Sequence, residues 1–214
     1  MVKLRTALKN KINNIFSVHG IHLNKESLAS EKGLKAALET QIDLLVDLEV
    51  KILVEQIQAL NKTITQLEQT IRRESQNLEG YRNLTSIKGI SGLGAGILLS
   101  IINDIGDFAD EGKLAAYFGI VPRVSSSNET EHSGRITKRG TKLGRTTLIQ
   151  CALIAQRYSP YLKTYYEKMK SRRGAGKAIV ALARKFLGII YRTLKNKWVF
   201  ADFPNFVLAA EATA

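Results

Sequence analysis

The sequence has little cysteine, proline or tryptophan: 1, 3 and 1 among 214 residues. Few residues can therefore cross-link the chain or interrupt its helices. The single Cys151 excludes an internal disulfide, which is typical of a reducing, cytoplasmic compartment. No apolar run approaches the roughly 20 residues of a membrane-spanning helix, so we expect no membrane partner. The start, MVKLRTALKNKINNIF, lacks the apolar core and cleavage site of a secretory leader. A hydrophobic content of 44% instead predicts folded domains with a real core.

The positive charge lies almost entirely in the second half of the chain. Residues 1–110 carry 13 Lys and Arg against 13 Asp and Glu, whereas residues 111–214 carry 19 against 6, so the second half holds the whole net charge of +13. A field concentrated in this way attracts a polyanion to one half of the molecule. DNA or RNA binding is therefore favoured over the alternatives, a solvated basic surface or a ribosome-associated protein.

Helical periodicity dominates the first 80 residues. Apolar residues at helical spacing predict a short amphipathic helix over 1–16, and the polar stretch 17–32 predicts a loop. Residues 31–79 contain no proline and only one glycine, which favours either one long coiled-coil helix or two helices in a hairpin. An unbroken helix there would reach about 70 Å. Its apolar seam, which needs a partner such as a second copy or a missing domain, contains Ile57, Leu60, Ile64, Leu67 and Ile71.

A compact helical region follows from about Tyr81. The segment KLAAYFGIVPR predicts a helix that Pro122 stops, and the polar SSSNETEHSG predicts a loop. Helices are expected over 146–159, 161–170 and 178–194, and strand signals are weak. The fold class is mostly α: a long coiled-coil helix or helical hairpin, then a compact helical domain containing a helix-hairpin-helix. The expected division is a short N-terminal segment over 1–26, a coiled-coil linker over 27–80, a helical domain over 81–204 and a tail over 205–214.

The glycine-rich stretch LTSIKGISGLGAGILL, residues 84–99, predicts two helices joined by a tight turn. Such a helix-hairpin-helix contacts a nucleic-acid phosphate without reading bases, through backbone N–H groups that open the second helix. Gly89 and Gly92 would allow left-handed backbone angles close to the phosphate, and Lys88 would add a charge. The alternative is a helical turn packed through the small residues 94–96, with no ligand.

Several motifs then occur in a recognisable order. They are LTSIKGISGLGAGILLSII, DIGDF, AAYFGIVPR, a serine-containing loop, GRITKRG, LGR, Pro160 with Tyr166, and RRGAGKAIVALARKFLGIIYRTL. This run, over about residues 84–198, resembles the transposase domain of the insertion-sequence one-ten family, also called DEDD transposases, and of the related pilin-gene invertases. RTALKNKINNIFSVHGI resembles the segment after the family's N-terminal RuvC-like domain, and the long helix resembles its coiled coil.

The resemblance implies a site divided between two domains. Four acidic residues and a divalent metal, Mg²⁺, belong to the RuvC-like domain, which we expect to be missing here, so no cofactor is expected in this chain. A serine of the transposase domain attacks a DNA phosphodiester and becomes linked to the strand. The family serine stands five residues after the proline of the GxxP segment, which gives Ser127, although Asn128 replaces the glycine that follows it in the family.

The resemblance also implies partners and a location. Members bind DNA at the element ends and the target as assembled oligomers, here through the long helix, and some are guided by a structured RNA. The location would be the cytoplasm of a bacterium or archaeon, at the nucleoid.

Basic residues surround the candidate serine in the sequence. Arg123 precedes the loop, and His132 lies within it. We expect phosphate contacts from Arg123 and from the basic segment after the loop, although a solvated surface is the alternative. RRGAGK, residues 172–177, lacks the full phosphate-loop pattern and a preceding strand, so we reject a nucleotide site there. The basic segment contributes Arg135, Lys138, Arg139, Lys142 and Arg145, and Lys138, Gly140 and Arg145 match the family pattern.

Three hypotheses follow from the sequence. The first is a DNA transposase or recombinase fragment whose Ser127 works in a composite site with an absent metal-dependent domain. As an isolated chain it should bind DNA without cutting it. The second is a non-catalytic DNA-binding and dimerisation protein, such as a truncated remnant or regulator. The third is a helical RNA-binding protein unrelated to transposition.

Overall fold

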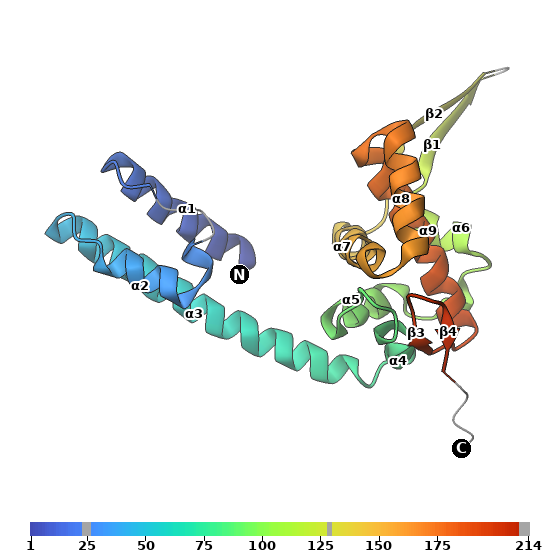
Figure 1. Cartoon of the computed structure of the whole chain (residues 1–214), viewed down its shortest axis with the longest axis horizontal. Coiled ribbons are helices and arrows are strands. Elements are labelled where there is room, and N and C mark those ends of the chain that lie inside the picture. Colours follow the sequence, from blue (N-terminus) through green and yellow to red (C-terminus); the bar gives the residue numbers. More distant parts are fainter. Residues whose placement is uncertain (23–26, 128–129, 210–214) are drawn as a thin grey trace. The chain divides into compact units, whose positions relative to one another are not determined.

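Most of the chain is helical, as the sequence predicts (Figure 1). The computed structural model describes residues 1–22, 27–127 and 130–209, with the backbone alone for 124–127 and 130–133. The described residues form two compact units, Met1–Thr70 and Ile71–Ala214. The expected loop over 17–32 and the expected tail over 205–214 fall partly outside these residues.

The first unit contains three α-helices and a short 3₁₀ turn. They are α1 (Val2–Val18), η1 (Ser27–Ala29), α2 (Glu31–Glu39) and α3 (Leu44–Ser75), of which α3 continues into the second unit. The stretch 31–79 is therefore two helices, and the unbroken-helix alternative is wrong. The break has a local cause, because the Asp43 carboxylate accepts hydrogen bonds from the N–H groups of Leu45 and Val46 at 2.9 and 3.0 Å. Asp43 is thus the cap that begins α3.

The core of the first unit uses part of the predicted coiled-coil seam. Ile57 is fully buried with residues of α1, η1 and α2, whereas Leu67 is 47% exposed. The predicted seam is therefore divided between an intramolecular core and an exposed stripe. The buried cluster contains Ile12, Phe16, Leu28, Leu34, Ala37, Val50, Leu53, Val54 and Ile57.

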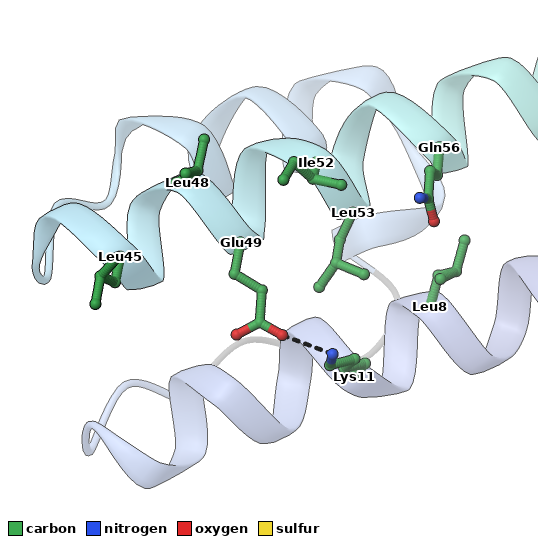
Figure 2. A pocket seen from close by; sticks show the side chains of 8 residues that line it. All are labelled: Leu8, Lys11, Leu45, Leu48, Glu49, Ile52, Leu53 and Gln56. Atoms are coloured by element: carbon green, nitrogen blue, oxygen red, sulfur yellow. Dashed lines mark ion pairs between the residues drawn. The ribbon is translucent and has the colours of Figure 1, made fainter.

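An apolar groove of about 450 Å³ lies between α1 and α3 in the first unit (Figure 2). Leu8 of α1 faces Leu53 of α3 there, and an ion pair between Lys11 Nζ and Glu49 Oε1 at 2.6 Å crosses the groove. Both charged side chains are about half exposed, so this pair adds little stability. Exposed leucines and isoleucine extend the apolar surface along α3, namely Leu44, Leu45, Leu48 and Ile52.

The second unit is built around α9. Its elements are α4 (Tyr81–Thr85), α5 (Gly92–Ile102), η2 (Ile105–Asp107), α6 (Glu111–Tyr117), β1 (Pro122–Ser127), β2 (Thr130–Ile136), α7 (Lys142–Tyr158), α8 (Pro160–Arg173), α9 (Ala175–Lys195), β3 (Phe200–Asp202) and β4 (Val207–Leu208). Helix α9 packs against α4, η2, α6, α7 and α8, because apolar side chains recur at helical spacing on more than one of its faces. Ala178, Leu182, Phe186 and Ile190 are fully buried on it.

The polar segment after Pro122 is a β-hairpin, so the loop expected there is wrong. Strands β1 and β2 pair antiparallel and extend away from the helices of the second unit (Figure 1). Pro122 begins β1 and does not stop the preceding helix. Helix α6 ends at Tyr117, because Gly119 adopts φ +67° and two hydrogen bonds close the turn: Gly119 N to Ala116 O at 2.9 Å and Ile120 N to Ala115 O at 3.1 Å.

The C-terminal end of the described chain folds back as a second hairpin. Strands β3 and β4 pair antiparallel, and the N–H of Ala209 donates to the carbonyl of Val199 at 2.7 Å. Phe200 and Phe203 meet edge to face with ring centroids 5.3 Å apart. The sequence indicated no element here, because each strand is only two or three residues long.

Candidate nucleic-acid interface

A basic groove of about 1220 Å³ lies between the base of the β1–β2 hairpin and helices α8 and α9. Figure 1 shows these two helices beside the hairpin. Glu111 is the single carboxylate among the described residues that line the groove. Its Oε2 forms an ion pair with Arg192 Nη2 at 2.9 Å. The lining therefore has a large excess of positive charge. Its cations are Arg135, Lys138, Arg173, Lys177, Arg184 and Lys185.

A β-bulge lies opposite Arg123 at the base of the hairpin. Pro122 pairs with Ile136 but Val124 pairs with Ser133, so Gly134 and Arg135 of β2 together face Arg123. A bulge leaves one residue out of the ladder and redirects its side chain. Arg135 lines the groove at this point. The sequence signal that could have indicated the bulge is Gly134 within an extended segment.

Lys138 is held by a close fit between its loop and the end of α6. The Lys138 N–H donates to the carbonyl of Gly119 at 3.0 Å, and Lys138 has an unusual positive φ of 56°. A Cβ on Gly140 would collide with the carbonyl oxygen of Tyr117 and lie 2.7 Å from the carbonyl carbon of Phe118. Only glycine fits at this position, which fixes where the basic segment leaves the hairpin.

Arg145 positions the same loop from α7. Its Nη1 donates to the carbonyl of Lys138 at 3.1 Å and also to the carbonyl of Gly140. The side chain is half-buried, and it does not line the groove. We therefore assign Arg145 a positioning role in this structure, and its predicted phosphate contact stays a prediction.

The remaining predicted cations lie outside the groove lining. Arg123 is exposed on β1, where its Nη2 donates to the carbonyl of Thr137 at 3.5 Å. Arg139 and Lys142 are exposed near the start of α7, which Thr141 caps by accepting from the N–H of Gly144 at 3.0 Å. Of the predicted basic residues, the groove thus brings together Arg135 and Lys138.

The predicted helix-hairpin-helix lies at the other end of α7. Gly89 has φ +109°, and a Cβ on it would lie 2.5 Å from the backbone nitrogen of Ala155. Gly92 begins α5, where a Cβ would collide with the Tyr81 hydroxyl. Packing against the backbone of α7 therefore accounts for Gly89. Gly92 does not adopt the predicted left-handed angle, and the atoms that a Cβ there would meet are side-chain atoms. Lys88 is exposed beside Gly89, which contacts α7 at Ala155, about 15 Å along that helix from Arg145. The phosphate contact predicted for Lys88 stays a prediction.

Residues 81–167 match the family model described as "Transposase IS116/IS110/IS902 family". The chain is also 30% identical over 215 residues to a "Transposase for insertion sequence element IS1111A" of Coxiella burnetii, covering 92% of this chain and 56% of that protein. The chain belongs to this transposase family. It is 26% identical over 213 residues to a "Probable family 20 transposase" of Pseudomonas aeruginosa, covering 92% and 61%. It is also 25% identical over 114 residues to an uncharacterized insertion element IS110 protein of Streptomyces coelicolor, covering 53% and 28%.

The chain therefore spans a little over half the length of the two transposases that it matches along most of its own length. The region matched by the family model contains the hairpin and α7 but ends before Arg173. Four of the six groove cations lie beyond it, on α8 and α9. Sequence reasoning missed these four, although Lys177, Ala181 and Arg184 have the spacing of one helix face. They are Arg173, Lys177, Arg184 and Lys185.

Ser127, the serine that the family pattern selects, is the last residue of β1 and pairs with Thr130. At 3.2 to 3.4 Å per residue, its backbone lies about 16 Å from Pro122 at the hairpin base. Ser127 and Arg135, the groove cation that belongs to β2, are thus at opposite ends of the hairpin although they are close in the sequence. Asn128, which follows the serine, and the side chains of Ser127 and His132 lie outside the described residues.

Three further observations concern the rest of the described chain. Cys151 is in the core, where burial raises the pKa of its thiol to about 11. In residues 1–22, 27–127 and 130–209, no three His, Cys, Asp or Glu side chains gather in a way that could hold a metal ion. Over the same residues, no helix is both long and apolar enough to cross a bilayer.

Proposed function

We propose that this chain is the DNA-binding and strand-joining part of a transposase. The observation that carries this proposal is the basic groove, in which six cations face a single carboxylate that is already paired with Arg192. Such a surface suits a nucleic-acid backbone, because each cation that contacts a phosphate releases condensed counterions. The ligand that we propose is DNA at the element ends and at the target. A structured guide RNA, which carries the same negative charge, is a second proposed ligand.

Ser127 is the proposed nucleophile. Its hydroxyl oxygen forms a bond to a DNA phosphorus, the bond from that phosphorus to one deoxyribose oxygen breaks, and the serine proton ends on the leaving oxygen. One phosphoester bond replaces another, so no external energy source is needed. A serine hydroxyl requires a base or metal for activation and positive charge to stabilise the transition state.

Among the residues whose side chains are described, no three His, Cys, Asp or Glu gather in a way that could hold a metal ion, and we assign no metal ligand to them. The Mg²⁺ that the family resemblance implies would be held by a RuvC-like domain. The position of Ser127 at the far end of a two-stranded ribbon favours such a divided site. A serine about 16 Å from the hairpin base can reach into a site completed by another domain or another subunit.

Self-association through α3 would supply that second subunit. Leu45, Leu48 and Ile52 follow the three-and-four spacing of a coiled-coil seam and are 77%, 52% and 46% exposed. A second copy of this chain is the partner that this surface fits, since like seams pair with each other. Such an assembly would work at the nucleoid in the cytoplasm of a bacterium or archaeon.

A non-catalytic DNA-binding and dimerisation protein is the second candidate. Two observations favour it: Asn128 stands where the family has glycine, and Arg135, the groove cation on β2, lies at the opposite end of the hairpin from Ser127. In that case the groove and α3 would still act, but Ser127 would not.

A covalent-adduct experiment separates the two candidates. The full chain is mixed with labelled element-end DNA, a RuvC-like domain from a longer relative and Mg²⁺, and protein–DNA adducts are resolved under denaturing conditions. We expect an adduct with the native chain and with Ser126→Ala, which is the matched control, and none with Ser127→Ala. An adduct that survives Ser127→Ala excludes Ser127 as the nucleophile. DNA binding without any adduct supports the non-catalytic candidate.

A further inference from the structure

The basic groove also contains apolar and aromatic groups that phosphates cannot use. Tyr165, Met169 and Arg173 line it at successive four-residue intervals, so they lie on one face of α8. The hairpin base and α9 complete the apolar part of the lining with Ile120, Pro122, Ile136, Val180 and Ala181. A surface that served duplex phosphates alone would not need this mixture.

Tyr165 and Tyr161 both make cation–π contacts with Lys185, which lines the groove. Lys185 Nζ lies 4.9 Å from the ring centroid of Tyr165 and 4.8 Å from that of Tyr161. Tyr161 is 50% exposed, and its ring meets Phe206 edge to face with centroids 5.6 Å apart. Cation–π and edge-to-face contacts each favour one ring orientation, so the two tyrosine rings are held in place before any ligand binds.

The size of the groove limits its ligand. Its volume of about 1220 Å³ is only slightly above the roughly 300 to 1,000 Å³ of small-molecule pockets. That space fits a few nucleotides with their bases turned inward. A duplex would present only its phosphates to the rim, and the apolar lining would stay uncovered.

We propose that this groove binds a short unpaired segment of nucleic acid, with a base stacked on Tyr165. This inference rests on the proposed role of the groove in nucleic-acid binding. A nucleotide carries an aromatic base beside a negative phosphate, and the groove presents an aromatic ring beside a positive charge. Lys177, Arg184 and Lys185 bind the phosphates on either side of the stacked base. Single-strand binding proteins combine these same two features, a basic channel and aromatic platforms.

Binding assays on the full chain test this inference. Fluorescence anisotropy measures Kd for labelled oligo-dT and oligo-U of about 12 nucleotides, a length typical of one single-strand site, and for a DNA duplex of equal length. The variants are Tyr165→Leu, which removes the ring, Tyr165→Phe, which keeps it, and Arg184→Gln. Tyr158→Leu is the matched control, because Tyr158 is 53% exposed on α7 and does not line the groove.

The native chain is expected to bind a single strand more tightly than the duplex. Loss of one stacking contact, about 1 to 3 kcal/mol, predicts a 5- to 150-fold weaker Kd for the single strand with Tyr165→Leu. The duplex Kd should change little, and Tyr165→Phe and Tyr158→Leu should behave as native. The comparison of oligo-dT with oligo-U shows which strand the groove prefers. Circular dichroism of each variant confirms that it is folded.

The outcomes distinguish this inference from the proposed function. If Arg184→Gln weakens binding of both ligands while Tyr165→Leu changes neither, the groove binds nucleic acid and the inference is overturned. If Arg184→Gln weakens neither ligand, the proposed function of the groove itself fails. Photo-crosslinking with a 5-iodouracil oligonucleotide gives a residue-level readout. A crosslink mapped to Tyr165 supports the inference, and crosslinks found only outside the groove overturn it.

Discussion

Arg145 donates a hydrogen bond from its guanidinium to the backbone carbonyl of Lys138 at 3.1 Å, across the loop that joins the β-hairpin to α7. It thereby fixes a residue with positive φ that lines the basic groove. The side chain acts on the groove through another residue. The basic segment therefore contains at least two kinds of cation, some that face the groove and one that holds the loop in place.

Arg145→Met is expected to loosen this loop. Loss of hydrogen bonds from a charged donor should lower the free energy of unfolding by about 1.5 to 3 kcal/mol. Hydrogen exchange should become faster at residues 137–141, and nucleic-acid affinity should fall because Lys138 is displaced. Arg139→Met, which removes an exposed cation from the same segment, is the control and should leave exchange unchanged. Equal exchange in both variants would contradict the positioning role.

Gly140→Ala and Gly89→Ala should both destabilise the protein. The added Cβ would meet backbone atoms of α6 in the first case and of α7 in the second, and backbone cannot move aside cheaply. A loss of about 1 to 3 kcal/mol or more is expected for each in urea denaturation. Gly176→Ala is the matched control, since a Cβ there meets nothing within 4 Å in a helix, and it should be neutral or stabilising.

The Gly89 variant also tests the predicted helix-hairpin-helix. If Gly89→Ala keeps native stability but loses DNA affinity, the result supports the predicted phosphate contact at Gly89 and contradicts the packing explanation. If stability falls and the folded fraction still binds DNA normally, packing against Ala155 is the whole role of Gly89.

The salt dependence of binding should report the groove cations. Log Kd plotted against log salt has a slope set by the number of neutralised phosphates, about 0.7 per contact for a single strand and 0.9 for duplex. Lys177→Gln with Arg184→Gln should reduce the slope by about 1 to 2. The exposed pair Lys35→Gln with Lys51→Gln, in the first unit, removes the same charge and should leave the slope unchanged.

Cys151 should be unreactive in the folded protein. Burial raises the pKa of its thiol from 9.0 to about 11, so the thiolate is scarce at pH 8. Alkylation by iodoacetamide should be slow until urea unfolds the chain. Because the folded pKa lies above the unfolded one, this thiol contributes stability below pH 9 that is lost as the pH rises toward 11. Cys151→Ala should flatten that part of the stability curve; an unchanged curve would contradict the assignment.

Leu48→Glu should weaken self-association if α3 pairs with a second copy. The substitution places a charge in the exposed seam between Leu45 and Ile52, and sedimentation velocity would show a shift toward monomer. Glu55→Gln, an exposed change on the same helix, is the control. A native chain that is already monomeric at micromolar concentration would exclude this seam as a dimer interface.

The sequence predicted the parts of the fold that depend on local pattern. Helices α1, α7, α8 and α9 were expected from apolar spacing and lie close to their predicted positions. The sequence left open whether residues 31–79 form one helix or two, because the signal for the break before α3 is one capping residue, Asp43, with no glycine or proline beside it. The β1–β2 hairpin was missed because its strands are polar, and a ribbon that packs on no core shows no apolar alternation.

The candidate site was predicted less completely, for a reason of the same kind. Arg135 and Lys138 were chosen because they stand near a serine in the sequence, whereas the hairpin separates Ser127 from them in space. Arg173 and Arg184 face the same groove as Arg135, although they lie 38 and 49 residues further along the chain. Only packing of α8 and α9 beside the hairpin base brings these three residues together.

By itself, the sequence determined the mostly α fold, the concentration of positive charge in the second half and membership of a transposase family. These properties follow from composition, helical periodicity and ordered motifs, all of which are local. The tertiary structure alone decided which cations share a groove, that Tyr165 lies among them, and that Ser127 is held away from them at the end of a ribbon. Those relationships are set by contacts between distant segments, and the physical reason is that α9 buries its apolar faces against five other elements at once.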